Sequence, residues 1–401
     1  MIGQGIKEIE RVDEPWSHLD EADLIVFPDV YEGALQEYLV SQGKRVWGCR
    51  MGCELELDRA KAKEIAIKAG IDIGPYEVIK GLDALREHLK EHDDQHIKVS
   101  ATRGDFETFH SPTYKKIEPR LDDLEHNLGA RKKIIEFIVE EGISPAIEAG
   151  YDGYTVDGKY PDGAIIGIEI KDRAYVGCTM RYGKMPEPVR RVNDGLAPAL
   201  KKYGYRGFIS TEVRCTPDGG AYLVDMTCRG ASPPSELYQN MISNLGEVMW
   251  YGAEGLVVEP DYIAKWGAQV ILSSDWADDN WQQISFPKSI RDNVKLRNFC
   301  VIDGEYYVIP QSHGAVEIGA VVATGDTAAE AIAECKRIAK LVEGYSVEAP
   351  VDAMDEALAG LKKLLADTKE EPKPPLQRKA EEMFRAGKIS AKQLDKMVAA
   401  K

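Results

Sequence analysis

Residues 208–226 read FISTEVRCTPDGGAYLVDM, and this stretch decides the fold that the sequence predicts. An apolar run lies on each side of the turn sequence at 217–220, which is typical of an antiparallel hairpin. Glu212 and Asp225 interrupt the two apolar runs. Because they belong to neighbouring strands, their carboxylates can converge on one face of the sheet.

Two converging carboxylates repel each other unless a cation lies between them. Mg²⁺ typically uses one or two carboxylates together with phosphate oxygens, so the hairpin predicts a magnesium site for a phosphate-bearing ligand, with Mn²⁺ as an alternative ion. Two other interpretations remain open at this point. Glu212 and Asp225 could be a solvent-facing polar pair, or they could form salt bridges with Arg214 or Arg229.

Cationic residues upstream of the hairpin fit a bound phosphate. Lys98 lies between apolar neighbours in a predicted strand, and if it points inward it needs an anion; an edge-strand lysine in solvent is the alternative. The polar loop 100–105 could fold over phosphates. Arg59 and Lys61 begin a predicted helix, where cations oppose the macrodipole unless an anion lies nearby. A solvated helix face is their alternative.

Residues 146–157 predict a strand, a turn and a second strand. Backbone groups of that turn could contact an adenine edge, and Glu148 or Asp152 could accept hydrogen bonds from ribose hydroxyls.

Other polar residues give weaker signals. His88, His92 and His96 are four residues apart, but their segment leaves the helical pattern too early for one metal-binding face. His313 is either a substrate contact or an ordinary loop residue.

The bulk composition excludes several functional classes. The chain has 401 residues and a net charge of −16, so we expect two or three modules and neither nucleic acid nor membrane as a partner. Seven scattered cysteines indicate a reduced, cytoplasmic chain, and Cys49 and Cys53 are expected to be buried. No signal peptide or membrane-spanning run is visible.

Hydrophobic periodicity predicts a mixed α/β and α+β chain. Parallel strands at 24–27 and 45–48 flank a helix at 32–41, and further helices are expected at 57–69, 79–91, 131–141, 196–203 and 328–342. Antiparallel strands are expected from 146 to 176. The Pro-rich segment 369–375 is a predicted linker. The basic residues 376–401 beyond it form a predicted helical tail for oligomerisation or protein contact.

The order of these segments resembles the ATP-grasp superfamily, in particular its phosphoribosylamine–glycine ligases. The resemblance covers about residues 20–345 and is carried by 60–76, the Lys98 strand, the hairpin and 316–335. It implies a shortened N-terminal parallel α/β domain (1–75), a small ATP-grasp subdomain (76–145), a central domain with the metal hairpin (146–270) and a C-terminal α+β closing domain (271–350). The predicted linker and helical tail (351–401) are no part of the family pattern.

The resemblance also implies an activity, an ATP-dependent carboxylate–amine ligation through an acyl phosphate, of the kind used in purine biosynthesis. Lys98 and Arg59 or Lys61 would contact phosphates, Glu212 and Asp225 would hold Mg²⁺, and Arg229 would hold the carboxylate. Thr227 stands where the family has a metal-ligating Asn. The family's opening strand and Gly-rich loop are missing before Met1-Ile2-Gly3-Gln4-Gly5. The expected substrates are therefore a glycine-like carboxylate and an amine that need not be phosphoribosylamine. The rival hypothesis is a non-catalytic nucleotide-binding protein.

Overall fold

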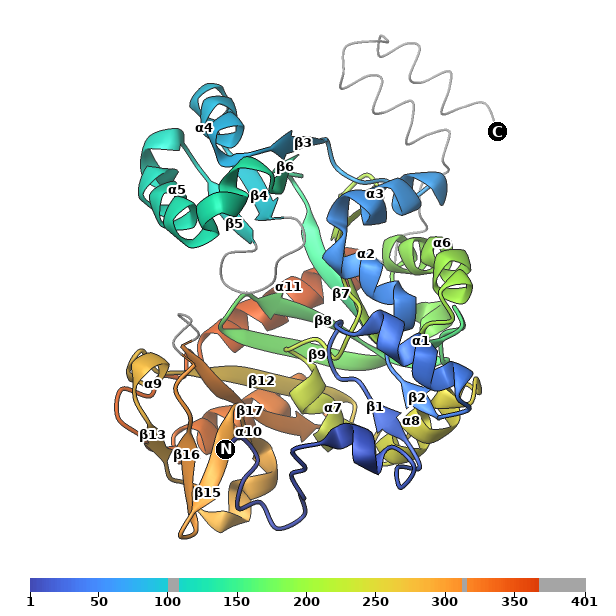
Figure 1. Ribbon diagram of the computed structural model, residues 1–401, viewed down its shortest axis with the longest axis vertical. Helices are drawn as coiled ribbons and strands as arrows, with labels where there is room; N and C mark the ends of the chain where they lie inside the picture. Colours follow the sequence, from blue (N-terminus) through green and yellow to red (C-terminus); the bar gives the residue numbers. More distant parts are fainter. Residues whose placement is uncertain (100–107, 312–315, 368–401) are drawn as a thin grey trace.

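The long antiparallel strands of the chain join into one eight-stranded sheet (Figure 1). The computed structural model describes residues 1–99, 108–311 and 316–367. In spatial order the sheet contains β11 (Ala221–Thr227), β10 (Arg206–Cys215), β7 (Ile147–Val156), β8 (Gly163–Ile170), β9 (Ala174–Arg181), β12 (Trp266–Ser273), β17 (Glu317–Gly325) and β14 (Val294–Leu296). The predicted hairpin is β10–β11 and the predicted antiparallel region is β7–β9, so both predictions are confirmed.

Amphipathic helices cover the apolar faces of this sheet. They are α6 (Glu187–Lys202), α10 (Ala328–Ala339) and α11 (Ala353–Asp367). Helix α10 begins at a capping box between Thr327 and Glu330, which satisfies its first backbone N–H groups. Helix α11 falls within residues 351–401, the predicted linker and tail. Its Met354, Ala357, Leu361 and Leu364 are buried, so this part of the segment belongs to the core.

A second, four-stranded sheet forms a separate module above the large one (Figure 1). Its order is β3 (Tyr76–Lys80), β6 (Glu136–Glu141), β4 (Gln95–Val99), β5 (Thr108–Ser111), and α4 (Leu82–Glu91) and α5 (Tyr114–Leu128) pack on it. The helix predicted at 79–91 therefore begins later, after a strand. The helix predicted at 131–141 is wrong, because Phe137, Ile138 and Val139 are buried in a strand between β3 and β4.

The N-terminal part is a small parallel unit, as predicted. Strands β1 (Ile25–Val26) and β2 (Val46–Trp47) pair in parallel on either side of α1 (Gly33–Ser41). Two short helices, η2 (Arg50–Cys53) and α2 (Glu54–Leu57), lead to α3 (Arg59–Lys68). Asp58 caps α3 by accepting a hydrogen bond from the Lys61 N–H, as its sequence position suggested. Backbone bonds between Gly48 and Arg206 attach this unit to β10.

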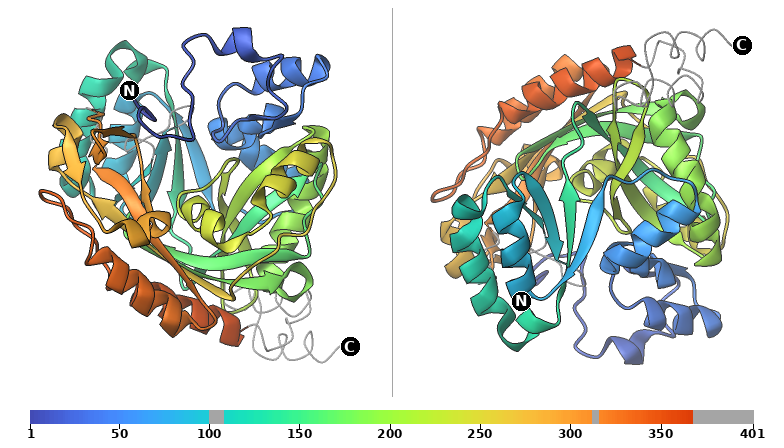
Figure 2. Two further views of the ribbon diagram at one scale, coloured as in Figure 1. Left: turned by 90° about the horizontal axis from the view of Figure 1, so that it is seen from below. Right: turned by 90° about the horizontal axis from the view of Figure 1, so that it is seen from above.

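A three-stranded sheet lies within residues 271–350, the predicted closing domain, which we call the closing module. Its strands are β13 (Gln282–Ile284), β16 (Glu305–Val308) and β15 (Phe299–Ile302). Figure 2 shows the N-terminal arm reaching this module, where the Gly3 N–H donates to Phe299 O and the Val301 N–H donates to Gln4 O. The remaining helices are η1 (Pro15–His18), η3 (Gly129–Lys133), η4 (Tyr182–Lys184), α7 (Ser235–Met241), α8 (Leu245–Ala253), α9 (Trp276–Asp279) and η5 (Lys288–Asn293). Among the described helices, none has the length and apolarity needed to span a bilayer.

Candidate active site

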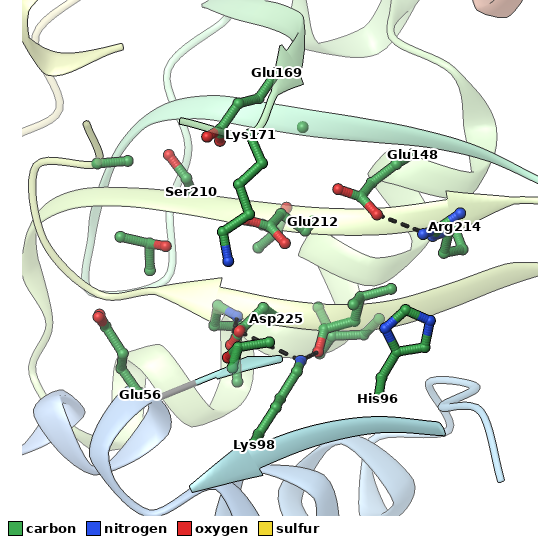
Figure 3. A pocket seen from close by; sticks show the side chains of 18 of the residues that line it. Glu56, His96, Lys98, Glu148, Glu169, Lys171, Ser210, Glu212, Arg214 and Asp225 are labelled. Atoms are coloured by element: carbon green, nitrogen blue, oxygen red, sulfur yellow. Dashed lines mark hydrogen bonds and ion pairs between the residues drawn. The ribbon is translucent and has the colours of Figure 1, made fainter. Parts of the chain in front are cut away.

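A cavity of about 520 Å³ lies between the small sheet and the hairpin side of the large sheet. Its walls come from α2 and α3, from β4 and the end of β6, and from β7, β8, β10 and β11. Figure 3 shows charged side chains entering it from opposite walls. Parts of the chain that are more than one hundred residues apart in sequence therefore meet here.

Glu212 and Asp225 are directly opposite each other across β10 and β11. Burial and the negative charges of Glu148, Asp225 and Glu169 raise the pKa of Glu212 well above its usual value. Burial alone would raise the pKa of Asp225 too, but the cations Lys98 and Arg59 lower it. The solvent-facing alternative is wrong, because both carboxylates line the cavity. Among the residues that the structure describes, Arg214 pairs with Glu148 and Arg229 pairs with Glu56, so neither arginine forms the alternative salt bridge with Glu212 or Asp225.

Lys98 is buried and points into the cavity, so the alternative of an edge-strand lysine in solvent is wrong. Its Nζ donates to Val224 O at 2.7 Å and lies 3.3 Å from both Asp225 Oδ2 and Glu140 Oε2. Burial alone would lower its pKa, but Asp225, Glu140 and Glu212 outweigh this effect and raise the pKa. Lys98 is therefore a fixed cation where the small sheet meets the hairpin.

Arg59 and Lys61 have different environments although they share the first turn of α3. Arg59 is buried, lines the cavity and donates through Nη1 to Val99 O at 2.8 Å. Lys61 lies outside the cavity lining and pairs with Glu54 Oε2 at 2.5 Å on a partly exposed surface. Of the two, only Arg59 can meet a ligand in this arrangement.

Residues 147–156 form one continuous strand, so the turn predicted within 146–157 is wrong. Alternation along β7 points Glu148 and Asp152 to the same face, and both line the cavity. Glu148 pairs with Arg214 at 2.9 Å near the surface. Asp152 is buried and accepts hydrogen bonds from Tyr175 and Ser210. Burial raises the pKa of Asp152 to about 6 although both hydrogen bonds oppose the shift.

Arg229 and Thr227 follow the hairpin and also line the cavity. The Arg229 Nε donates to Glu56 Oε1 at 3.1 Å, and Glu56 Oε2 accepts from the Cys228 N–H at 2.6 Å. Glu56 thus holds the backbone of Cys228 and the side chain of Arg229. Sequence reasoning missed Glu56, because nothing in the pattern of α2 links it to a segment more than 170 residues later.

Two further charged residues that sequence reasoning missed are Glu169 and Lys171, at the end of β8. In Figure 3 the Lys171 side chain extends toward Glu212 from the wall opposite Lys98. Glu169 is exposed toward the open side of the cavity. Desolvation of its carboxyl and the negative charges of Asp152, Asp172 and Glu148 raise its pKa to about 8. The available signal was charge at alternate positions ending an apolar strand, Glu169-Ile170-Lys171.

The histidines do not form the stripe that a metal site would need. His88 and His92 stack at 4.1 Å on and just after α4, whereas His96 belongs to β4 and lines the cavity. Within the described ranges, no group of three or more His, Cys, Asp or Glu side chains forms a metal cage. Cys49 and Cys53 are buried, as expected. The predicted loop 100–105, His313 and the tail 376–401 lie outside the described residues.

Comparisons with solved structures agree on the fold. The phosphoribosylamine–glycine ligase of Thermotoga maritima is 17% identical, covers 86% of this chain and 91% of its own, and has a TM-score of 0.65. A biotin carboxylase complex from Campylobacter jejuni is 16% identical over 86% and 81%, with a TM-score of 0.58. The N5-carboxyaminoimidazole ribonucleotide synthetase of Thermotoga maritima is 14% identical over 83% and 85%, with a TM-score of 0.53.

No protein-family model and no curated protein matches the sequence. At such low sequence identities the structural matches establish the fold and not the activity. The chain has the ATP-grasp fold.

Proposed function

We propose, on the premise of this fold, that the protein is an ATP-dependent ligase that joins a carboxylate to an amine. The observation that carries the proposal is the pairing of Glu212 with Asp225 across the hairpin, with Lys98 held beside them by a different module. Two neighbouring carboxylates repel each other in a partly desolvated site. A bound Mg²⁺–triphosphate would offset this repulsion, and Lys98 would contact its phosphates.

The residues of the cavity fit a nucleotide with Mg²⁺. Glu212 and Asp225, with Thr227 beside them, would hold the ion. Its charge would offset the burial and the neighbouring negative charges that raise the pKa of Glu212. When bound, Mg²⁺ would neutralise phosphate oxygens and stabilise charge during transfer. Lys98, Arg59 and Lys171 would contact phosphates. Glu148 and Asp152 remain our candidates for the ribose side, with Glu148 the more accessible.

In the proposed reaction a substrate carboxylate attacks the γ-phosphorus of ATP, which gives an acyl phosphate and ADP. An amine then attacks the acyl carbon, and phosphate leaves as the amide forms. Arg229 would orient the carboxylate through the guanidinium nitrogens that Glu56 does not engage. The protein's part is positioning and electrostatic stabilisation, and no nucleophilic side chain is required.

The identity of the substrates is the finer part of the proposal. The similarity to the glycine ligase supports a small, glycine-like carboxylate. The amine need not be phosphoribosylamine, because the architecture alone does not select it. A nucleotide-binding protein without turnover is the second candidate, and Thr227 in place of an Asn is the observation that favours it.

A screen of ADP release tests the proposal. The protein would be incubated with Mg²⁺ and ATP, with each amino acid as carboxylate, and with or without an amine such as phosphoribosylamine generated in situ. We expect ADP to depend on a particular carboxylate and amine, and to fall by about 10²-fold or more in Asp225→Asn. ATP binding without release for any pair would contradict ligation and support the binding protein. Full activity in Asp225→Asn would contradict the assigned metal site.

A further inference from the structure

The closing module has an aromatic groove on its outer surface, far from the ATP-grasp cavity in the fold. The groove has a volume of about 470 Å³ and contains Trp276, Trp281 and Tyr345. These side chains are 44%, 44% and 68% exposed. The Trp276 and Tyr345 rings meet edge to face, 5.2 Å apart, so they present a preformed apolar surface.

The rim of the groove is acidic, and backbone hydrogen bonds fix its shape. Ser285 and Glu343 exchange two backbone hydrogen bonds of 2.9 Å, which fixes the two segments that bear the aromatic rings. Residues 273–285 contain three aspartates and no lysine or arginine, and the exposed Glu343 lines the groove. Aromatic rings with a polar rim are how proteins recognise proline-rich segments, and the charge here favours a basic one.

The chain itself carries such a segment. The sequence Pro372-Lys373-Pro374-Pro375 has the Pro-x-x-Pro spacing that aromatic grooves bind. Residues 372–401 contain eight lysines and arginines and three acidic residues, in a chain whose overall net charge is −16. Sequence and charge therefore both match the segment to the groove.

The geometry of α11 decides which copy of the groove the segment can reach. Helix α11 begins eight residues after Tyr345 and packs on β12, β9, β8 and β7, so it carries the chain away from the closing module (Figure 2). Its 15 residues span about 22 Å. The five residues from Asp367 to Pro372 can span at most about 17 Å, which is less than the length of α11, so we infer that this segment does not return to the groove of the same chain.

We propose that the groove formed by Trp276, Trp281 and Tyr345 binds the segment Pro372–Pro375 of a second copy of this chain. The exchange is reciprocal, since each copy offers one groove and one segment, and it produces a closed dimer. The proline-rich segment is the anchor, and the basic residues after it face the acidic surface around α9. This inference does not depend on the proposed ligase activity.

The test uses the full chain and two readouts, molar mass by light scattering and peptide binding by tryptophan fluorescence. We expect the wild-type protein to have twice the monomer mass of 44.5 kDa, and both Pro372→Ala/Pro375→Ala and Trp281→Ala to be monomers. A peptide of residues 369–379 should bind the double proline variant. Trp281→Ala, added to that variant, should weaken peptide binding by about thirtyfold, as for a tryptophan at the centre of an interface.

Matched controls keep the result specific. Trp16 is also an exposed tryptophan, 58% exposed, on another part of the molecule, and Trp16→Ala should leave both readouts unchanged. Glu343→Lys should weaken peptide binding without removing an aromatic ring, so it serves if Trp281→Ala is unstable. A monomeric wild-type protein, or a dimer that survives both the proline and the Glu343→Lys substitutions, would overturn the proposal. Peptide binding by a monomeric wild type would instead indicate an external proline-rich partner.

Discussion

At the scale of single residues, Lys98 shows how burial and charge produce a binding group. Its ammonium is enclosed, yet Asp225 and Glu140 keep it charged. Two carboxylates on different modules thus hold one cation at the cavity wall. Such a group is already ordered before an anionic ligand arrives, which reduces the entropy cost of binding.

We expect Lys98→Met to weaken binding of a non-hydrolysable ATP analogue with Mg²⁺. A hydrogen bond to a charged group is worth about 1.5–3 kcal/mol, which corresponds to roughly ten- to a hundredfold in the dissociation constant. Isothermal calorimetry measures it. Lys61→Met removes the same charge at a position on α3 outside the cavity, and it should leave affinity intact. Equal effects of the two variants would rule out a direct contact for Lys98.

Glu169 links the cavity to the pH dependence of stability. Its pKa is about 8 in the folded protein and about 4.3 in an unfolded chain. The folded state therefore holds the proton more tightly. The stability that this contributes is complete below the unfolded pKa and is lost as pH rises through about 8. For the ligand-free protein, we expect Glu169→Gln to raise the melting temperature at pH 8 relative to wild type.

The same variant should make little difference near pH 4, where wild-type Glu169 is protonated in both states. Thermal unfolding followed by circular dichroism between pH 4 and 8 gives both values. Glu136→Gln, on an exposed position of β6, is the control and should follow the wild-type curve. Parallel curves for wild type and Glu169→Gln would show that Glu169 ionises freely in the cavity.

At the scale of elements, the edge strand β15 is covered by the N-terminal arm rather than left open. An uncovered edge strand presents unpaired N–H and C=O groups to other chains. The arm supplies two backbone hydrogen bonds to β15. It also makes a close approach at Gly5, where an added Cβ would lie 2.0 Å from Val301 O. The contact therefore requires glycine.

We expect Gly5→Ala to destabilise the protein more than Gly43→Ala. Both glycines have positive φ, 76° and 80°, so both substitutions carry a similar left-handed penalty of about 1–2 kcal/mol. Gly43 has open space around its Cβ position, so the additional loss in Gly5→Ala reports the contact with Val301. Denaturant unfolding gives the two free energies, and hydrogen exchange of the Val301 amide should accelerate only in Gly5→Ala. Equal losses would mean that the arm does not hold β15 in solution.

At the scale of the whole molecule, the cavity lies where three modules meet: the small sheet, the large sheet and the N-terminal unit. The small sheet supplies Lys98, the hairpin supplies Glu212 and Asp225, and α2 supplies Glu56. Helix α11 packs on β7, β8, β9 and β12 of the large sheet. Anything that loosens the large sheet should therefore reach the cavity, whereas a change beyond α11 should not.

Two truncations separate these cases. A chain ending at Asp367 keeps α11, so we expect it to bind the ATP analogue with wild-type affinity. Its melting temperature should equal that of the monomeric Pro372→Ala/Pro375→Ala variant at the same protein concentration. A chain ending at Pro350 loses the buried Met354, Leu361 and Leu364. Each such loss typically costs about 2–5 kcal/mol, so this chain should fail to fold cooperatively. Loss of nucleotide affinity in the chain that ends at Asp367 would show that the residues after α11 contribute to the cavity.

Local sequence by itself determined the hairpin of 208–226, the parallel unit around α1, the capped start of α3 and the acidic pair Glu212 and Asp225. These features depend on neighbours in the chain, on turn residues and on alternation, which are all visible in a single sequence. The tertiary structure alone decided that 131–141 contains a strand, because its apolar residues are buried between two strands that come earlier in the chain. It also decided that Arg59 rather than Lys61 faces the cavity, and that Glu56 lines the cavity. Those placements depend on contacts between modules distant in sequence, and no local pattern encodes such contacts.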